Sequence, residues 1–188
     1  GVLGVLDDVA HATPSGWREA GLSLYLLGTT RAELDGSTWS DVIHGHLGGL
    51  PPKLDLAAEQ ALAGILINAS RDDLVLAAHD LSKGGLGQAL VDSVLRFGFG
   101  AKVDLAGVLA RDGVDLATAL FSESTARAIV AVPRGSEVAL TDLCSARSFP
   151  VVRIGETSEE PVLAVDGFEV TIADLHEAST ATLARHFG

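Results

Sequence analysis

The sequence of 188 residues contains no methionine, one cysteine and few aromatic residues. The lone cysteine, Cys144, cannot form a disulfide within the chain, which excludes a disulfide-stabilised fold and makes the reducing cytoplasm the expected compartment. Because Cys144 follows Leu140 and Leu143 in a helical pattern, we expect it to be a small buried hydrophobic residue. Apolar runs fall far short of the roughly 20 residues that span a bilayer, so no membrane segment is expected.

Basic residues are also scarce. The chain has 13 Lys and Arg against 25 Asp and Glu, and a formal net charge of −12. Such an acidic protein is a poor candidate for binding nucleic acid or an anionic membrane surface. If it handles phosphate groups, the attraction must come from backbone N–H donors, from Mg²⁺ or from basic groups of another domain.

Hydrophobic residues make up 47% of the chain, which is enough for a core, and the length suits one domain. We expect residues 21–188 to form that domain and residues 1–20 to be a linker or an incoming strand. Because a sequence without methionine cannot be an intact translation product, we expect the chain to be part of a longer polypeptide.

Hydrophobic periodicity predicts strands and helices that interleave without strict alternation, which favours an α+β fold with a mixed β-sheet flanked by helices. Asp55 and Ser136 precede two of the helices as N-caps, and Thr171 and Asp174 have the spacing of a capping box. The expected strands cover 22–27, 74–78, 102–104, 127–132, 151–154, 162–165 and 168–170. The expected helices cover 38–45, the stretch after Asp55, two short pieces within 105–120, 86–97, 137–147 and the C-terminal stretch ending near Phe187.

One strand ends in His79 and Asp80, and a turn with the paired glycines Gly84 and Gly85 leads into an amphipathic helix. A helix N-terminus carries unpaired N–H donors and partial positive charge, so such a corner can bind a phosphate or a carboxylate. Plain connection chemistry explains the same residues, with His79 half-buried and Asp80 or Ser82 as the N-cap. The spacing alone leaves both interpretations open.

Four motifs occur along the chain in a recognisable order. They are Leu27-Gly28-x-Thr30-x-x-Glu33-Leu34-x-Gly36-Ser37, Gly49-x-Pro51-Pro52-x-x-Asp55, Ala78-His79-Asp80-Leu81-Ser82-x-Gly84-Gly85-Leu86 and Leu120-Phe121-Ser122-Glu123-Ser124-x-x-Arg127. Together they resemble the C-terminal-type domain of the aminoimidazole ribonucleotide synthetase superfamily, and most closely that of the phosphoribosylformylglycinamidine synthases. The resemblance covers essentially the whole chain. The first motif is similar to the second of the two domain copies in the large synthetase subunit.

The resemblance implies a ligase of purine biosynthesis that uses ATP and Mg²⁺. The full enzyme phosphorylates the formamide oxygen of formylglycinamide ribonucleotide, and ammonia then displaces the phosphate to give the amidine. The implied partners are the remaining domains of the subunit, a glutamine amidotransferase subunit and a small accessory subunit. The family's catalytic histidine and its ATP and metal ligands belong to other domains. We therefore expect no catalytic residue and no metal ligand here, no tight cofactor binding, and no activity of the chain alone.

The resemblance and the corner together suggest a set of substrate- or nucleotide-binding candidates. These are Gly36, Ser37, His79, Asp80, Ser82, Gly84, Gly85, Glu123 and Ser124. Each has a structural alternative: turn formation for Ser37, attachment of the strand end to the next helix for His79 and Asp80, and a structural role for Glu123 and Ser124. Arg127 is expected to form an ion pair with Glu123. Asp35 departs from the family pattern, which usually has glycine there, and its charge opposes a nearby phosphate.

Two other functions stay open. The chain could belong to a sister ATP-dependent enzyme, such as aminoimidazole ribonucleotide synthetase, selenophosphate synthetase or thiamine monophosphate kinase, although the Glu33-Leu34-x-Gly36-Ser37 loop disfavours this. It could also be a purely structural or assembly domain. A domain separated from its neighbours exposes apolar surface, so self-association of the chain is expected.

Overall fold

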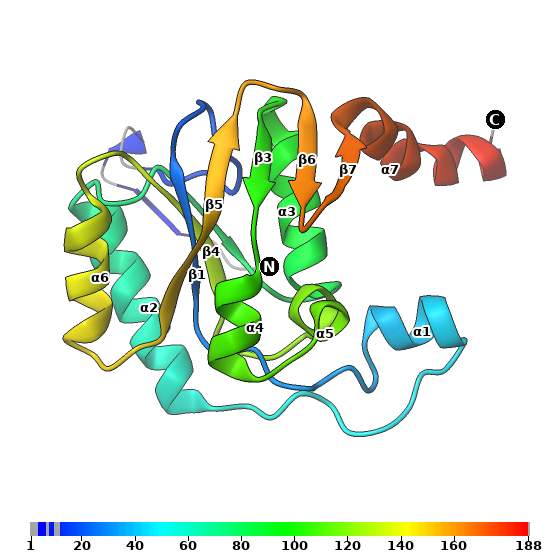
Figure 1. Ribbon diagram of the computed structural model, residues 1–188, viewed down its shortest axis with the longest axis horizontal. Coiled ribbons are helices and arrows are strands. Elements are labelled where there is room, and N and C mark those ends of the chain that lie inside the picture. The colour runs from blue at the N-terminus through cyan, green and yellow to red at the C-terminus, as the bar shows by residue number, and fades with distance from the viewer. Residues whose placement is uncertain (1–3, 7, 10–11, 188) are drawn as a thin grey trace.

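The computed structural model describes residues 4–6, 8–9 and 12–187. One mixed seven-stranded sheet runs through these residues in the order β2-β4-β1-β5-β3-β6-β7, with helices on both faces (Figure 1), which confirms the expected α+β fold. The strands are β1 (Ser23–Leu27), β2 (Ala77–Asp80), β3 (Gly100–Val103), β4 (Ala128–Val132), β5 (Val151–Ser158), β6 (Val162–Val165) and β7 (Phe168–Thr171). The helices are α1 (Thr38–His44), α2 (Leu56–Arg71), α3 (Gly85–Phe97), α4 (Ala106–Asp112), α5 (Leu116–Phe121), α6 (Glu137–Ser145) and α7 (Ile172–Phe187).

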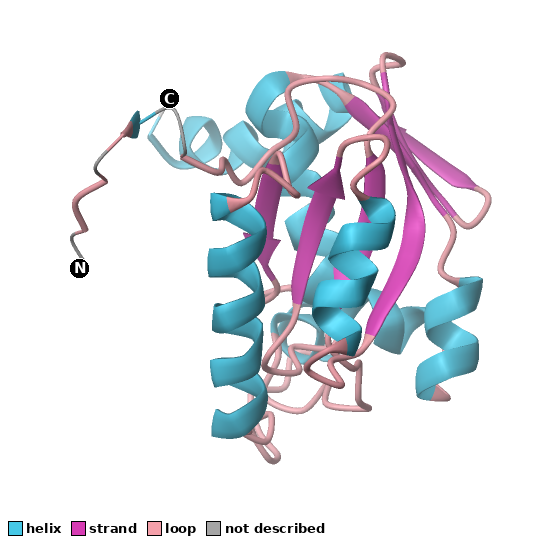
Figure 2. Cartoon of the chain, turned by 90° about the vertical axis from the view of Figure 1, so that its left-hand side faces the viewer, coloured by secondary structure: helices cyan, strands magenta, loops and turns pink. Residues whose placement is uncertain are grey.

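The central strand β1 separates two hydrophobic cores, because successive side chains of a strand point to opposite faces. Leu24 and Leu26 belong to the core under α3, α4 and α5. Tyr25 and Leu27 belong to the core under α2 and α6, the two helices at the front of Figure 2. Cys144 is fully buried in this second core, as the sequence predicts. The molecule is therefore layered as helices, sheet and helices.

Helix α2 begins where the sequence predicts. Its N-cap Asp55 accepts hydrogen bonds from the N–H groups of Ala57 and Ala58 at 3.1 and 3.0 Å. Ser136 is the N-cap residue of α6, as predicted, but its side chain makes no capping hydrogen bond. Instead, the carboxylate of Glu137 accepts the N–H of Gly135 at 2.6 Å.

Some boundaries differ from those predicted. Strand β2 lies a few residues later than the apolar run, because the pairing with β4 includes His79 and Asp80 themselves. Strand β5 continues to Ser158 through residues that the sequence suggested as an acidic loop. The sequence predicts a linker or an incoming strand over residues 1–20. Residues 1–3, 7, 10 and 11 of this segment lie outside the described residues, and its described residues contain no strand. Trp17 in this segment is buried, and its indole N–H donates to the Phe99 carbonyl at 2.9 Å.

The sheet register brings the loops that carry the sequence motifs together at one end of the sheet. Leu27 at the end of β1 and Asp80 at the end of β2 both pair with Ala128 at the start of β4. The loops that follow β1 and β2 and the loop that precedes β4 therefore leave the sheet side by side. No helix among the described residues is long and apolar enough to cross a membrane.

Candidate functional site

The loops at this end of the sheet meet at the carboxylate of Glu123. Its Oε1 accepts the N–H of Thr38, the first residue of α1, at 2.9 Å. The same oxygen accepts the N–H of Gly84, the N-cap of α3, at 2.8 Å. A carboxylate is favoured at such positions because helix N-termini carry unpaired donors and partial positive charge. The chain thus supplies its own anion to the corner for which the sequence suggested an anionic ligand.

The paired glycines are required by the backbone and by close packing. Gly84 and Gly85 have φ values of 80° and 64°, in the left-handed region that favours glycine. A Cβ on Gly85 would lie 2.4 Å from the Ser122 carbonyl oxygen and 2.7 Å from that of Leu120. The close approach at Gly85 is therefore to the end of α5.

Ser122 and Ser124 are fully buried and hold the backbone of the β1–α1 loop. Ser122 Oγ donates to the Arg31 carbonyl at 2.8 Å, and Ser124 Oγ accepts the Arg31 N–H at 3.0 Å. The two hydroxyl groups also contact each other at 2.9 Å. The hydroxyl of Ser124 therefore makes hydrogen bonds that hold this loop.

Arg127 is buried, with 2% of its surface exposed, and its guanidinium bonds to neutral acceptors. Nε donates to the Ser124 carbonyl at 3.0 Å, Nη1 to Thr30 Oγ1 at 3.1 Å, and Nη2 to the Ser122 carbonyl. The expected ion pair with Glu123 is therefore wrong, because Glu123 points to Thr38 and Gly84 instead. Burial lowers the pKa of Arg127 to about 10, against the opposing effect of Asp112 and Glu33.

Asp112 and Arg111, at the end of α4, are site residues that the sequence reasoning missed. Asp112 Oδ2 accepts the N–H of Thr30 at 2.8 Å, and Arg111 Nη2 donates to the Gly28 carbonyl at 2.6 Å. The two side chains also form an ion pair, with Arg111 Nε 2.7 Å from Asp112 Oδ1. These contacts fix the start of the β1–α1 loop across more than 80 positions of sequence, and no local pattern indicates them.

His79 lies between the end of its own strand and helix α3. Its Nδ1 is 2.7 Å from the Asp80 carbonyl oxygen, and its Nε2 is 3.8 Å from Asp92 Oδ2 on α3. This is the geometry of the structural alternative, in which His79 attaches the strand end to the following helix. The carboxylate of Asp80 is 76% exposed and faces outward.

Gly36 and Ser37 form the turn that starts α1. Gly36 is exposed with a φ of 64°, and Ser37 is buried as the N-cap. The hydroxyl of Ser37 donates to the Leu34 carbonyl and accepts the Ser40 N–H at 3.2 Å. Ser82, by contrast, is exposed at the α3 corner.

Glu33 connects the first and second motifs. Its Oε1 accepts the N–H of Lys53 at 2.9 Å, and Thr125 Oγ1 donates to the Lys53 carbonyl at 3.0 Å. Its other oxygen, Oε2, is buried without a hydrogen-bond partner within the described part of the chain. All four sequence motifs therefore meet in one network of side-chain-to-backbone hydrogen bonds.

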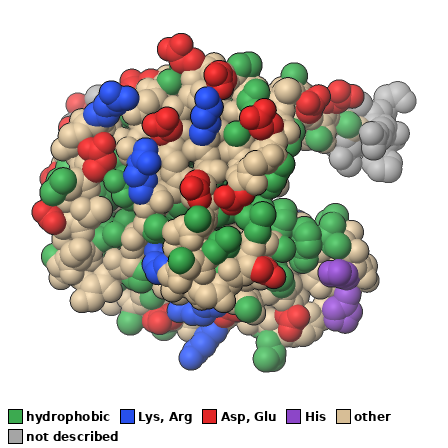
Figure 3. All heavy atoms as spheres, viewed as in Figure 1, with side chains coloured by type: hydrophobic (Ala, Val, Ile, Leu, Met, Phe, Trp, Pro, Cys, Tyr) green, Lys and Arg blue, Asp and Glu red, His purple; other side chains and the backbone are tan. Residues whose placement is uncertain are grey.

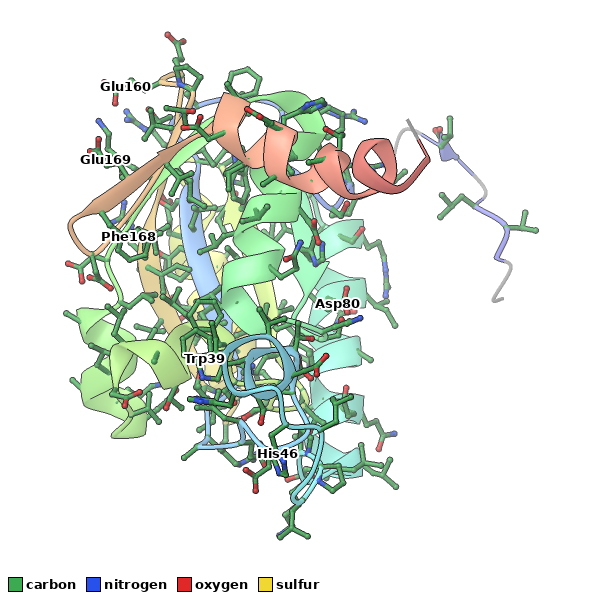
Figure 4. The ribbon with its side chains drawn as sticks, turned by 90° about the vertical axis from the view of Figure 1, so that its right-hand side faces the viewer. Trp39, His46, Asp80, Glu160, Phe168 and Glu169 are labelled. Carbon is green, nitrogen blue, oxygen red and sulfur yellow. The ribbon has the colours of Figure 1, made fainter. Side chains whose placement is uncertain are left out.

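Two hollows flank this network. One, of about 400 Å³, lies between α2 and the α3 corner, and Asp80, Ser82, Glu123 and Arg127 are among its lining residues. Figure 4 shows Asp80 beside α2 on this side. The other, of about 360 Å³, is an apolar groove between α1, α3 and β7. Across residues 4–6, 8–9 and 12–187 there is no group of three or more His, Cys, Asp or Glu side chains that could hold a metal ion.

Comparison with protein families gives a match to the C-terminal domain of AIR synthase related proteins over residues 19–167. The chain is 57% identical over its full length to the phosphoribosylformylglycinamidine synthase subunit PurL of Renibacterium salmoninarum. It is 55% identical over its full length to the same subunit of Leifsonia xyli. The chain spans about a quarter of the length of these curated relatives.

Solved structures share the fold. A Thermotoga maritima PurL complexed with FGAR superposes with a TM-score of 0.78 at 22% identity, over 89% of this chain and 30% of that one. A PurL of the same organism complexed with ATP gives a TM-score of 0.70, over 89% of this chain and 27% of that one. A thiamine-monophosphate kinase from Stenotrophomonas maltophilia gives a TM-score of 0.55 at 21% identity, over 84% of this chain and 54% of that one.

Proposed function

This chain belongs to the family of AIR synthase related proteins, as their C-terminal domain, and we propose that it works within a phosphoribosylformylglycinamidine synthase. In that enzyme ATP converts the formamide oxygen of formylglycinamide ribonucleotide into a phosphate leaving group, and ammonia displaces it to form the amidine. We further propose that this is the C-terminal domain of the second copy in the synthetase subunit, that Mg²⁺ is held by other domains, and that the isolated chain is inactive.

The observation that carries this proposal is the 57% identity over the full chain to a PurL subunit. The four motifs that prompted the resemblance are the residues that the structure joins through Glu33 and Glu123. Sequence similarity and hydrogen-bond geometry thus coincide at one end of the sheet. Shared fold adds to this support, because the PurL structures have the same topology over 89% of the chain.

The contribution of this chain to the reaction is positioning. Phosphoryl transfer and amide activation depend mainly on placement and charge neutralisation, so a domain can assist without supplying a general base. Asp80 and Ser82 are exposed at the 400 Å³ hollow, and Glu123 also lines it. Among the sequence candidates, these three are the ones we propose to face a nucleotide or substrate. The side chains of Ser37, His79 and Ser124 instead hold the loops in place through hydrogen bonds to backbone groups.

The relatives suggest the setting of this domain. One Thermotoga maritima structure with this fold is a PurLQS assembly. We propose by analogy that the whole subunit that contains this chain works with a glutamine amidotransferase subunit and a small accessory subunit. The cytoplasm is the proposed compartment, in keeping with the single buried cysteine.

A chimera tests the proposal. The matching quarter of the Renibacterium salmoninarum subunit is replaced by this chain, and ATP-dependent amidine formation is assayed with the partner subunits and with ammonia as the nitrogen source. We expect the chimera to be active, and both this chain alone and the subunit without the replaced quarter to be inactive. A folded chimera without activity, or turnover by the chain alone, would refute the proposal.

A purely structural role is the second candidate, and it is favoured by the internal use of Glu123, Ser37 and Ser124. Asp80→Asn in the active chimera separates the two. A substrate-facing Asp80 predicts a fall in kcat/KM of about tenfold, since one lost polar contact in the transition state has that effect. Unchanged kcat/KM for Asp80→Asn, and likewise for Ser82→Ala, would assign this end of the sheet to structure alone.

A further inference from the structure

Exposed apolar side chains concentrate in one short segment. Of the 14 large hydrophobic residues that are exposed within the described chain, six lie in residues 42–56. We call this segment the apolar strap. Its exposed members are Val42 (73%), Ile43 (53%), Leu47 (73%), Leu50 (81%), Leu54 (60%) and Leu56 (71%). A concentration of exposed apolar side chains of this kind is typical of a protein-protein contact.

The strap is continuous with the apolar groove. Trp39 attaches α1 to the body by stacking on Phe121, with ring centroids 4.3 Å apart and an angle of 17° between the planes. Val42 and Ile43 on the same helix line one wall of the groove, and Phe168 on β7, itself 46% exposed, lines the other. Figure 3 shows hydrophobic side chains around the notch between α7 and α1, and Figure 4 shows Trp39 and Phe168 on its two sides.

The charge of this face differs from that of the molecule. The charged residues within 38–56 are Asp41, Lys53 and Asp55, which give this segment a net charge of −1 with histidine neutral. The whole chain has a net charge of −12. No lining residue of the groove is charged. Depletion of charge over an apolar patch is the compositional mark of an interface core.

The charge of the whole chain bears on the identity of the partner. Each copy carries a formal net charge of −12, so a second copy of this chain would bring the same excess of negative charge, which is electrostatically unfavourable. A partner with an apolar face and without that excess of negative charge would be complementary.

We propose that the strap and groove form one docking face for another domain of the same longer polypeptide, which presents an apolar surface. The proposal rests on the proposed function, since the relatives are about four times as long as this chain and carry the rest of their length covalently attached. A covalently attached domain has a high effective concentration, so it is the occupant that reaches this face before a free partner does.

Cysteine labelling tests the docking face. Leu50→Cys on the strap is compared with the matched control Val138→Cys on α6, which is 69% exposed and does not line the groove. Each variant is prepared in the 188-residue chain and in the full-length chimera, and maleimide modification of the variant peptide is followed by mass spectrometry. The native Cys144 is buried and serves as an internal measure of folding. Leu47→Cys replaces Leu50→Cys if that variant does not fold.

Both cysteines should react rapidly in the chain alone. In the chimera the Leu50→Cys rate should fall by about tenfold or more, while the Val138→Cys rate stays the same. Equal Leu50→Cys rates in the two contexts would overturn the proposal. Concentration-dependent protection in the chain alone, with a dimer in sedimentation, would show instead that a second copy covers the face. Amidine formation is measured on the same chimera: activity without protection rejects only the docking face, and protection without activity rejects only the proposed function.

Discussion

The Glu123 carboxylate accepts the backbone N–H of Gly84 at 2.8 Å, across 39 positions of sequence. The same oxygen binds the N–H of Thr38, so one carboxylate joins the start of α1 to the start of α3. An exposed phosphate-binding corner would leave those donors free. Here a carboxylate of the protein itself binds these two donors, and this relationship determines the first prediction.

Glu123→Ala should lower the free energy of unfolding by about 2 kcal/mol or more, because it removes two charge-assisted hydrogen bonds and leaves two backbone donors unpaired. Glu123→Gln keeps an oxygen acceptor at the same place and should cost clearly less. Urea unfolding followed by circular dichroism measures both. The exposed Glu169→Ala is the control and should change stability by less than about 0.5 kcal/mol. Equal effects of the Ala and Gln substitutions would contradict this account.

Arg127→Met should destabilise the chain by about 3 kcal/mol or more, because it leaves the Ser122 and Ser124 carbonyl groups and the Thr30 hydroxyl without their donor in a buried site. The control is Arg147→Met, whose guanidinium is exposed and makes one long bond of 3.4 Å to a helix carbonyl. That control should fall within about 0.5 kcal/mol of the unchanged chain. Similar losses for the two arginines would show that burial of Arg127 is not what matters.

The two N-cap positions of α2 and α6 should respond differently. Asp55→Ala removes bonds to two backbone N–H groups and should cost about 1 kcal/mol. Ser136→Ala removes no side-chain capping bond and should be nearly neutral. Thermal unfolding of both variants under the same conditions gives the comparison. A Ser136 variant as damaging as the Asp55 variant would mean that the hydroxyl caps α6 in solution after all.

Ionisation of the Cys144 thiol should lower the free energy of unfolding at alkaline pH. Burial raises the pKa of its thiol to about 11 from the ordinary value of 9.0. The folded state therefore holds this proton more tightly than the unfolded state, so the contribution is complete below pH 9 and is lost as the pH rises towards 11. Urea unfolding of the chain and of Cys144→Ala between these limits isolates the effect. Their stability difference should shrink with rising pH, and a constant difference would refute the linkage.

Titration calorimetry with ADP and Mg²⁺ should show no saturable heat for the chain alone. The Gly84 N–H at the α3 corner is bound by Glu123, the chain carries a net charge of −12, and its described residues contain no metal-binding cluster. Titration of the full-length chimera is the positive control. Saturable binding to the chain alone would place a nucleotide site within it.

Much of the fold follows from local sequence. The helix after Asp55, the hairpin turning at Asp166 and Gly167, and the capping box of Thr171 and Asp174 are each determined by neighbours along the chain, and each is confirmed. The end of β2 was less predictable. Its pairing with β4 includes the polar His79 and Asp80, and only the position of β4 makes those residues part of a strand.

The site was harder to predict than the fold. The motifs lie on loops that meet at one end of the sheet, but they did not indicate which partner each side chain binds. Arg127 and Glu123 lie four positions apart with opposite charges, yet each bonds to backbone groups or hydroxyl groups elsewhere, because backbone groups at loop ends need partners when they are buried. The role of Asp112 depends on a loop more than 80 residues away, and hydrophobic periodicity carries no information about such a contact.

The central position of β1 in the sheet has a consequence for the synthesis of this chain on the ribosome. Leu27 pairs with Ala128 on one side and with Val151 on the other, so both neighbours of this apolar strand are translated about a hundred residues or more after it. At about 5–20 residues per second, ribosomes need roughly 6 to 25 seconds to supply the second neighbour. Both edges of the nascent strand stay bare until β4 is made, and one edge stays bare until β5 is made, so we expect the first half of this chain to bind chaperones during its synthesis.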